Sequence, residues 1–187
     1  MCHVLVNVEK GTAELPFPSK NVLVCPGETQ WLRGFSVAEE HNHWHENGVK
    51  VISGDHLDIN TAQTPGMNRA AAINLATAGA QKLWAGTVQI HADAKTGAHH
   101  HGDLESIIYI ISGKARMRWG EKLEYVAEAG PGDFIFVPPY VPHQEINAND
   151  DEPLNCVLVR SGQDPVVVNL DIPVIEEPDG LHWVDPI

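Results

Sequence analysis

Short β-rich runs bounded by turn-forming residues fill residues 81–170, and they constrain the fold of the chain most. Glycine, proline, asparagine or aspartate separates one run from the next, as at residues 112–113, 119–120 and 130–132. Many short strands at near-regular spacing, with little helix, are typical of a β-sandwich or β-barrel. We therefore expect an all-β fold with strands at residues 83–90, 106–111, 115–119, 134–137, 154–160 and 166–170.

The remaining sequence divides the chain into three unequal parts. We expect residues 1–65 to form an extended N-terminal segment that packs on the barrel, residues 66–172 the barrel itself, and residues 173–187 a proline-containing C-terminal strap. Residues 69–80 are rich in alanine, and their alternation fits a strand almost as well as a short helix. Both possibilities stay open at this stage.

Composition narrows the classes of partner and the cellular compartment. The net charge of −13 repels nucleic acid and anionic lipid, so neither is an expected partner. No apolar run approaches the roughly 20 residues of a membrane helix, and the first residues lack the features of a secretion signal. The three cysteines (Cys2, Cys25 and Cys156) are few and widely spaced, which favours a reducing compartment. We predict a cytoplasmic protein.

A histidine triplet near the centre of the chain is the clearest chemical feature. Side chains alternate between the two faces of a strand, so His99 and His101 share one face and His100 points the opposite way. Glu105 has the same parity as the first two, provided that the connection through residues 102–104 keeps the register. Two imidazoles and one carboxylate would then converge from a single stretch.

A second segment, residues 132–147, offers a fourth ligand. His143 follows a predicted strand that ends at Pro138 and Pro139. Proline cannot donate to a sheet ladder and favours a rigid turn, which would fix the position of His143.

Together these two segments resemble the paired motifs of the cupin superfamily. The first family motif appears as His99-x-His101, three residues, Glu105 and then Gly113, and the second as Gly132, Pro138, His143 and Asn147 at the family spacing. The resemblance covers about residues 83–170. Three positions depart from it: Asp93 and Tyr140 stand where the family has glycine, and Gly113 lies one residue late.

The resemblance implies a single cupin β-barrel, also called a jelly roll or double-stranded β-helix. It also implies a divalent transition metal ion (Mn, Fe, Ni, Co, Cu or Zn) held by His99, His101, Glu105 and His143. A metalloenzyme acting on a small organic metabolite is the first expectation. An Fe- or Cu-dependent dioxygenase, a non-catalytic binding or sensing module, and a barrel that has lost its metal are the alternatives.

A narrower resemblance, to a subgroup of small bacterial cupins, comes from residues 63–69, 115–120 and 138–147. It implies release of a methylthio group from a methylthio-sugar phosphate during sulfur salvage. Such chemistry would use a metal ion to polarise the sugar carbonyl and a thiol to accept sulfur. Cys156 is the cysteine of the predicted barrel, so it would take that role; packing as a small buried hydrophobe is the alternative.

Several further residues carry weaker expectations. Tyr109 shares parity with Glu105 and so could project into the barrel and act as a general acid, although core packing is the simpler alternative. Arg69 could hold an anionic group of a substrate. The cluster of His41, His43 and His45 could form a second metal site or a polar loop. Residues 107–111 are apolar on both faces, which favours a homodimer.

Overall fold

The structure is a computed structural model, and it describes residues 48–178. The predicted N-terminal segment therefore lies outside the described residues up to position 47. The same holds for the His41, His43 and His45 cluster, for Cys2 and Cys25, and for the end of the predicted strap beyond residue 178.

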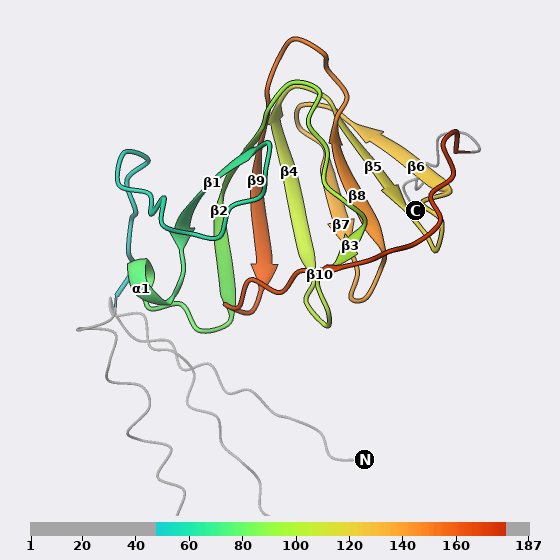
Figure 1. Ribbon diagram of the computed structural model, residues 1–187. Helices are drawn as coiled ribbons and strands as arrows, with labels where there is room; N and C mark the ends of the chain where they lie inside the picture. The colour runs from blue at the N-terminus through green and yellow to red at the C-terminus, as the bar shows by residue number, and fades with distance from the viewer. Residues whose placement is uncertain (1–47, 179–187) are drawn as a thin grey trace, which may run out of the picture. The chain divides into compact units, whose positions relative to one another are not determined.

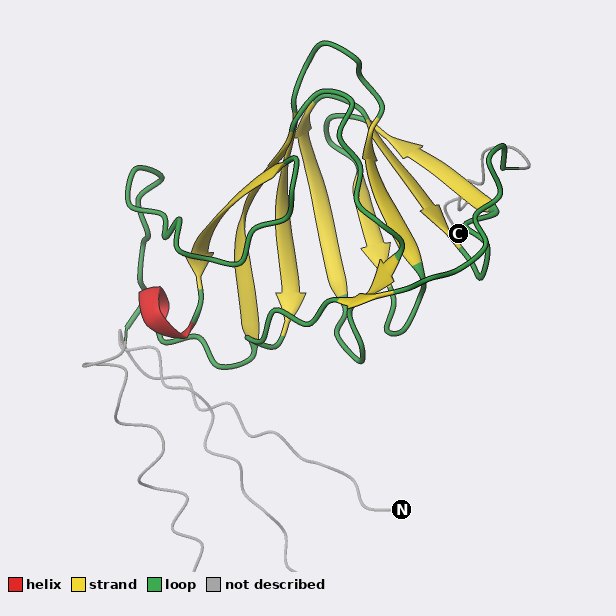
Figure 2. Ribbon diagram, in the orientation of Figure 1, coloured by secondary structure: helices red, strands yellow, loops and turns green. Residues whose placement is uncertain are grey.

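Two antiparallel five-stranded sheets face each other, which confirms the predicted all-β jelly-roll fold (Figures 1 and 2). The first sheet has the order β1 (Met67–Ile73), β2 (Leu83–Ile90), β9 (Leu154–Ser161), β4 (Ser106–Ser112), β7 (Phe134–Val137). The second has the order β10 (Val168–Asn169), β3 (His99–His100), β8 (His143–Asn147), β5 (Ala115–Trp119), β6 (Tyr125–Ala129).

Alternation along the central strands builds the core. On β4 the even-numbered residues Ile108 and Ile110 are buried, and on β9 the buried positions include Leu154 and Leu158. Each fully buried aliphatic side chain stabilises the fold by roughly 1.5–3 kcal/mol relative to exposure. The two sheets are therefore held together by their inward faces, as the period-2 pattern predicts.

Residues 69–80 contain both elements that their sequence allowed. The strand β1 ends at Ile73, and the one-turn helix α1 (Leu75–Ala78) follows. Asn74 and Thr77 form a capping box at its start, and Gly79 ends it in the left-handed conformation at φ 74°. No helix within residues 48–178 is long and apolar enough to cross a membrane.

All six predicted strands are present, with ends that shift by up to two residues. Three further strands, β3, β6 and β8, were not predicted. At residues 138–139 the prolines end β7 as expected, yet the chain pairs again from His143, where β8 joins β5 and β3. His143 therefore lies at the start of a strand rather than in a turn.

The outer face of β4 and β7 is apolar and exposed in the single chain. Its large side chains are Ile107, Tyr109, Ile111, Phe134 and Phe136, with exposed fractions from 37% to 71%. Residues 107–111 are therefore buried only on their inner face within one subunit. A second subunit covering the outer face stays a prediction.

Candidate metal centre

Three histidine side chains meet inside the barrel. His99 lies on β3, His101 follows that strand directly, and His143 begins β8, whose pairing with β3 places His99 opposite His143. All three are buried, and one ring nitrogen from each lies within 4.8 Å of the others. Their ring centroids are 4.4–5.0 Å apart. The two predicted motifs thus contribute to one site.

Backbone carbonyls fix the orientation of all three imidazoles. Each Nδ1–H donates to a carbonyl oxygen: His99 to Gly97 at 2.9 Å, His101 to Val166 at 2.8 Å, and His143 to Val141 at 2.9 Å. This pairing leaves the lone pair on Nε2, the atom that can bind a metal. The Nε2 atom of His143 is buried without a hydrogen-bond partner. A buried orphan acceptor of this kind fits a metal ligand.

The surroundings of His101 and His143 favour the neutral imidazole, which is the form that binds metals. Burial, together with the nearby Arg160 guanidinium, lowers the pKa of His101 to about 3. Burial also lowers the pKa of His143, although the Glu145 carboxylate acts against that shift. Neutral side chains with free Nε2 lone pairs do not have to lose a proton before they bind a cation.

The structure does not bring Glu105 into the group of three histidines, so it does not support Glu105 as the fourth ligand. Its side chain is exposed, and it is not part of the group formed by the three histidines. The reason is the connection after His101, where Gly102 adopts a φ of 63° and Leu104 N–H donates to the His101 carbonyl. This turn breaks the register, so Ser106 rather than Glu105 points inward.

Glu145 is a carboxylate near the histidines that the sequence reasoning missed. It lies on β8 two residues after His143, so both side chains share the inner face of that strand. Burial raises the pKa of its carboxyl, but the neighbouring histidines and Arg69 outweigh that effect and lower it. The spacing of two residues between His143 and Glu145 on one strand is the sequence signal that could have identified Glu145.

Two arginines lie beside the histidines. Arg160, at the end of β9, is only 6% exposed, and its Nη2 donates to His101 Nε2 at 3.4 Å. The Nε atoms of Arg160 and Arg69 are buried without partners. Sequence reasoning named Arg69 but missed Arg160, although Arg160 continues the inward-facing series of Leu154, Cys156 and Leu158 on its strand.

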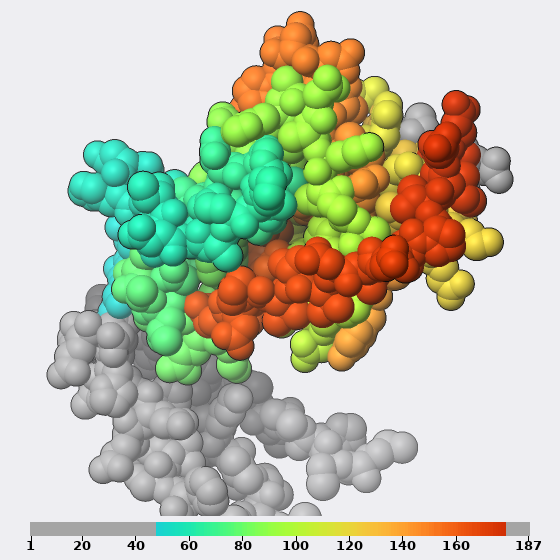
Figure 3. Space-filling view, in the orientation of Figure 1, coloured from blue at the N-terminus to red at the C-terminus, as the bar shows by residue number. Residues whose placement is uncertain are grey.

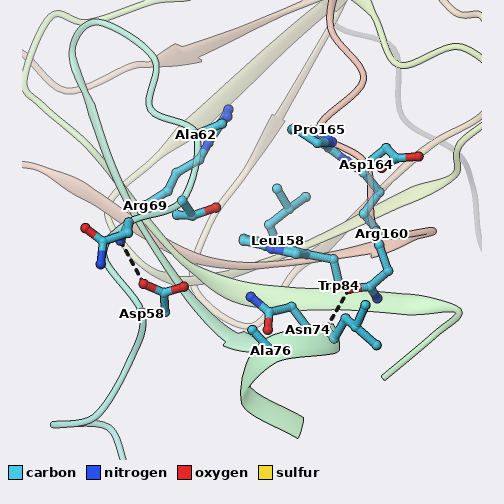
Figure 4. Close-up of a pocket in the computed structure, with 14 residues that line it drawn as sticks. Asp58, Ala62, Arg69, Asn74, Ala76, Trp84, Leu158, Arg160, Asp164 and Pro165 are labelled. Atoms are coloured by element: carbon cyan, nitrogen blue, oxygen red, sulfur yellow. Dashed lines mark hydrogen bonds between the residues drawn. The ribbon is translucent and has the colours of Figure 1, made fainter. Parts of the chain in front are cut away.

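Both arginines line a cavity of about 340 Å³ (Figure 4). Trp84 and Leu158 contribute its apolar wall. Asp58, residues 60–62 and residues 163–165 also line it, and Figure 3 shows the chain segments that contain them on the same face of the molecule. Arg160 thus connects this cavity to the histidine group.

Cys156 points inward, as its strand position allowed, but it belongs to the apolar core. The side chain is 3% exposed, and the thiol donates to the Val88 carbonyl oxygen. Burial and the Glu145 carboxylate raise its pKa to about 12. A nucleophilic role needs the thiolate, so the surroundings of Cys156 do not support the predicted catalytic role and agree with packing as a small hydrophobe.

Tyr109 does not project into the barrel, so its position does not support the predicted role as a general acid. It shares parity with Glu105, and both lie on the outside of the sheet for the same reason, the broken register before β4. Its ring packs against Phe134, with centroids 4.8 Å apart.

The motif positions other than the ligands have structural roles. Asn147 is buried, and its side-chain amide donates to the carbonyl oxygens of Ile90, His91 and Glu152. A Cβ at Gly113, where φ is 88°, would lie 2.9 Å from the Leu154 backbone.

Asp93 and Tyr140 replace family glycines yet keep the glycine-like backbone, with φ values of 59° and 60°. The turns of the family are therefore retained without their glycines at these two positions.

Comparisons with known proteins agree with this architecture. A family model described as a cupin domain matches residues 86–160. A comparison with curated proteins gives no match. Solved structures with a similar fold include the polyketide cyclase RemF from Streptomyces resistomycificus, at 21% identity and a TM-score of 0.56, covering 70% of this chain and 89% of that one.

Two further structures share the fold at low identity. A Klebsiella pneumoniae protein with a double-stranded β-helix domain is 17% identical with a TM-score of 0.51, covering 66% of this chain and 98% of that one. The oxalate decarboxylase of Bacillus subtilis, which has Mn(II) centres, is 21% identical with a TM-score of 0.50, covering 60% of this chain and 30% of that one. The chain therefore contains a region, residues 86–160, that matches the cupin domain, and its fold is shared by solved double-stranded β-helix structures.

Proposed function

We propose that this cupin is a metal-dependent enzyme that acts on a small organic metabolite. One observation carries the proposal: three buried imidazoles, each with Nδ1 held by a carbonyl oxygen, bring one ring nitrogen apiece within 4.8 Å of the others beside a cavity. A cavity of about 340 Å³ is within the range of small-molecule sites.

The chemistry follows from the residues around that point. A divalent metal ion bound by His99, His101 and His143 would supply Lewis-acid polarisation of a substrate oxygen. Glu145, on the same strand face as His143, is a carboxylate that can accept a proton from a bound molecule. The apolar wall formed by Trp84 and Leu158 limits water on one side of the cavity.

The ligand set favours some metals over others. Three imidazoles suit Zn, Cu, Fe or Ni, and a nearby carboxylate extends the range to Mn and Co. Fe or Cu would admit a dioxygenase, and that alternative predicts turnover that stops without oxygen. A non-catalytic sensing module predicts saturable ligand binding and no product with any of these metals.

The sulfur-salvage version of the function stays a prediction, and Cys156 is the place to test it. With a pKa of about 12, the thiol stays protonated at pH 8 and should react slowly. We expect alkylation of Cys156 by iodoacetamide at pH 8 to be over 100-fold slower in the folded protein than in urea, measured by peptide mass mapping. Equal rates would restore the thiol as a candidate nucleophile, and loss of methanethiol release in Cys156→Ala would establish it.

Cytoplasmic location and homodimer formation also stay predictions. Size-exclusion chromatography with light-scattering detection measures the number of subunits directly. We expect two subunits for the parent and one for Phe134→Glu, because Phe134 is 71% exposed on the apolar outer face. A monomeric parent would show that another surface, or none, is covered.

Elemental analysis tests the proposed function first. Protein expressed without added metal should hold about one first-row metal ion per chain, and His143→Ala should lose it. The matched control is His56→Ala, because His56 is exposed and lies outside the site. Products should then be sought by NMR with panels of keto acids, sugar derivatives and sugar phosphates. Metal content that is equal in both variants would contradict the proposal, as would a metal-loaded protein that turns over none of the panels.

A further inference from the structure

We propose that Arg69 and Arg160 form an anion-binding subsite in the cavity beside the histidines, so that the substrate carries a carboxylate or phosphate group. This inference rests on the proposed function for the claim that the bound anion is a substrate. The binding of an anion can be tested separately. Arg69 comes from β1 and Arg160 from β9, and Figure 4 shows both among the residues that line the cavity.

The first argument is the state of the two guanidinium groups. Arg160 is nearly fully buried, and the Nε–H of each arginine is buried without an acceptor. Within residues 48–178, no Asp or Glu oxygen forms an ion pair with either of them. A buried charge without a counter-ion reduces stability, and an anionic ligand would supply the counter-ion.

The second argument is the balance of charge around the pair. Glu145 is a half-buried carboxylate whose charge acts on both arginines, so the two guanidiniums exceed this carboxylate by one unit of charge. Asp58 and Asp164 also line the cavity, but Asp164 is exposed and Asp58 is only half-buried, whereas Arg160 is 6% exposed. The buried end of the cavity is therefore the cationic end.

The third argument is the chemistry of the donors. A guanidinium presents planar pairs of N–H groups that match the oxygens of a carboxylate or phosphate, and bonds of this kind are stronger than neutral hydrogen bonds. Arg160 also contacts His101 Nε2. An anion held by Arg160 would therefore lie next to the candidate metal centre, with its carbon part against Trp84 and Leu158.

Calorimetric titration with two simple probes, inorganic phosphate and malonate, tests the proposal. Ionic strength is held constant with sodium chloride, and the full-length protein is used both as purified and after chelation. We expect one saturable site per chain for at least one probe. Arg69→Gln and Arg160→Gln should each weaken it at least tenfold, whereas Arg116→Gln should change it less than twofold. Arg116 is the matched control because it is exposed and pairs with Glu128.

The two probes separate the two sources of the anion. Binding of phosphate alone would assign a phosphate ester, and binding of malonate alone a carboxylic acid. No saturable binding of either probe, or equal affinities in all variants, would overturn the proposal. If Arg160→Gln does not fold by circular dichroism, Arg160→Lys replaces it, because lysine keeps the charge and loses the planar fork.

His143→Ala distinguishes this inference from the proposed function. That variant should lose the metal and still bind the anion after chelation, because the arginines are held by β1 and β9 rather than by β8. A parent protein without metal would defeat the proposed function and leave the anion site standing. Metal binding without any anion binding would overturn the anion site and leave the proposed function standing.

Discussion

The two halves of the barrel interior are built from the same strands but differ in chemistry. Along β9 the inward residues run from Leu154 through Cys156 and Leu158 to Arg160, and along β4 they run from Ile110 through Ile108 to Ser106. One half is a packed apolar core with a small inner cavity of about 20 Å³, which holds little more than a single water molecule and is also lined by Arg69 and Glu145. The other half holds the histidines, the arginines and the cavity of about 340 Å³.

This division separates stability from chemistry. The apolar half buries aliphatic side chains and holds the sheets together, so the polar half can keep buried groups that no internal partner satisfies. Burying such groups reduces stability, and the packed half offsets that loss. This barrel can therefore keep buried histidines and arginines at one end of the fold.

The largest expected effect contrasts two positions on β4, one in each half. Ile110→Ala should lower the free energy of unfolding by about 3 kcal/mol, because Ile110 is fully buried and its removal leaves a cavity. Ser106→Ala should change it by less than about 0.5 kcal/mol, since the Ser106 hydroxyl has no partner to lose. Urea unfolding of both variants makes the comparison, and similar costs at the two positions would contradict the division.

A smaller effect is expected on metal affinity. Arg160 donates to His101 Nε2 and carries a positive charge beside the histidines. In phosphate-free buffer, Arg160→Gln should therefore bind Zn²⁺ at least about fivefold more tightly, since close like charges repel. A competing chromophoric chelator measures the affinity. Weaker binding would mean that Arg160 holds His101 in place instead of opposing the cation.

The smallest effect concerns two turns with positive φ, one that leads to His143 and one beside Ile110 in the apolar half. Tyr140 has a φ of 60°, which costs about 1 kcal/mol in a residue with a side chain. Tyr140→Gly should stabilise the fold by about 0.5 kcal/mol, because the relief of this strain exceeds the entropy that glycine adds to the unfolded chain. The reverse change is Gly132→Ala, at φ 96° with open space around its Cα, and it should destabilise by about 1 kcal/mol. Thermal unfolding would show both shifts, and equal signs would refute the argument.

Alternation predicted the apolar half of the barrel well, because packing follows a period of two. The motif spacing predicted that His99, His101 and His143 meet. The alternation argument failed for Glu105 and Tyr109. The turn at Gly102 reverses which residues of β4 face inward, so the even-numbered side chains are buried and the odd-numbered ones are exposed. Parity is reliable within a strand but not across an irregular connection.

Alternation within single strands could have identified the two site residues that the motif spacing did not predict. Glu145 shares a face with His143, and Arg160 ends an inward series that is otherwise apolar. Neither residue belongs to the ligand pattern of the family, so the motif spacing alone does not predict a role for it. The state of Cys156 needed the three-dimensional structure, because its pKa depends on burial and on Glu145, a residue from another strand.

The most direct test is a crystal structure of the protein loaded with Zn²⁺, with the metal located by its anomalous scattering. The account predicts one ion about 2.0–2.1 Å from the Nε2 atoms of His99, His101 and His143, with the side chain of Glu105 pointing away from it. An ion held through Nδ1 atoms, an ion bound by Glu105, or a site empty of zinc at full loading would contradict it.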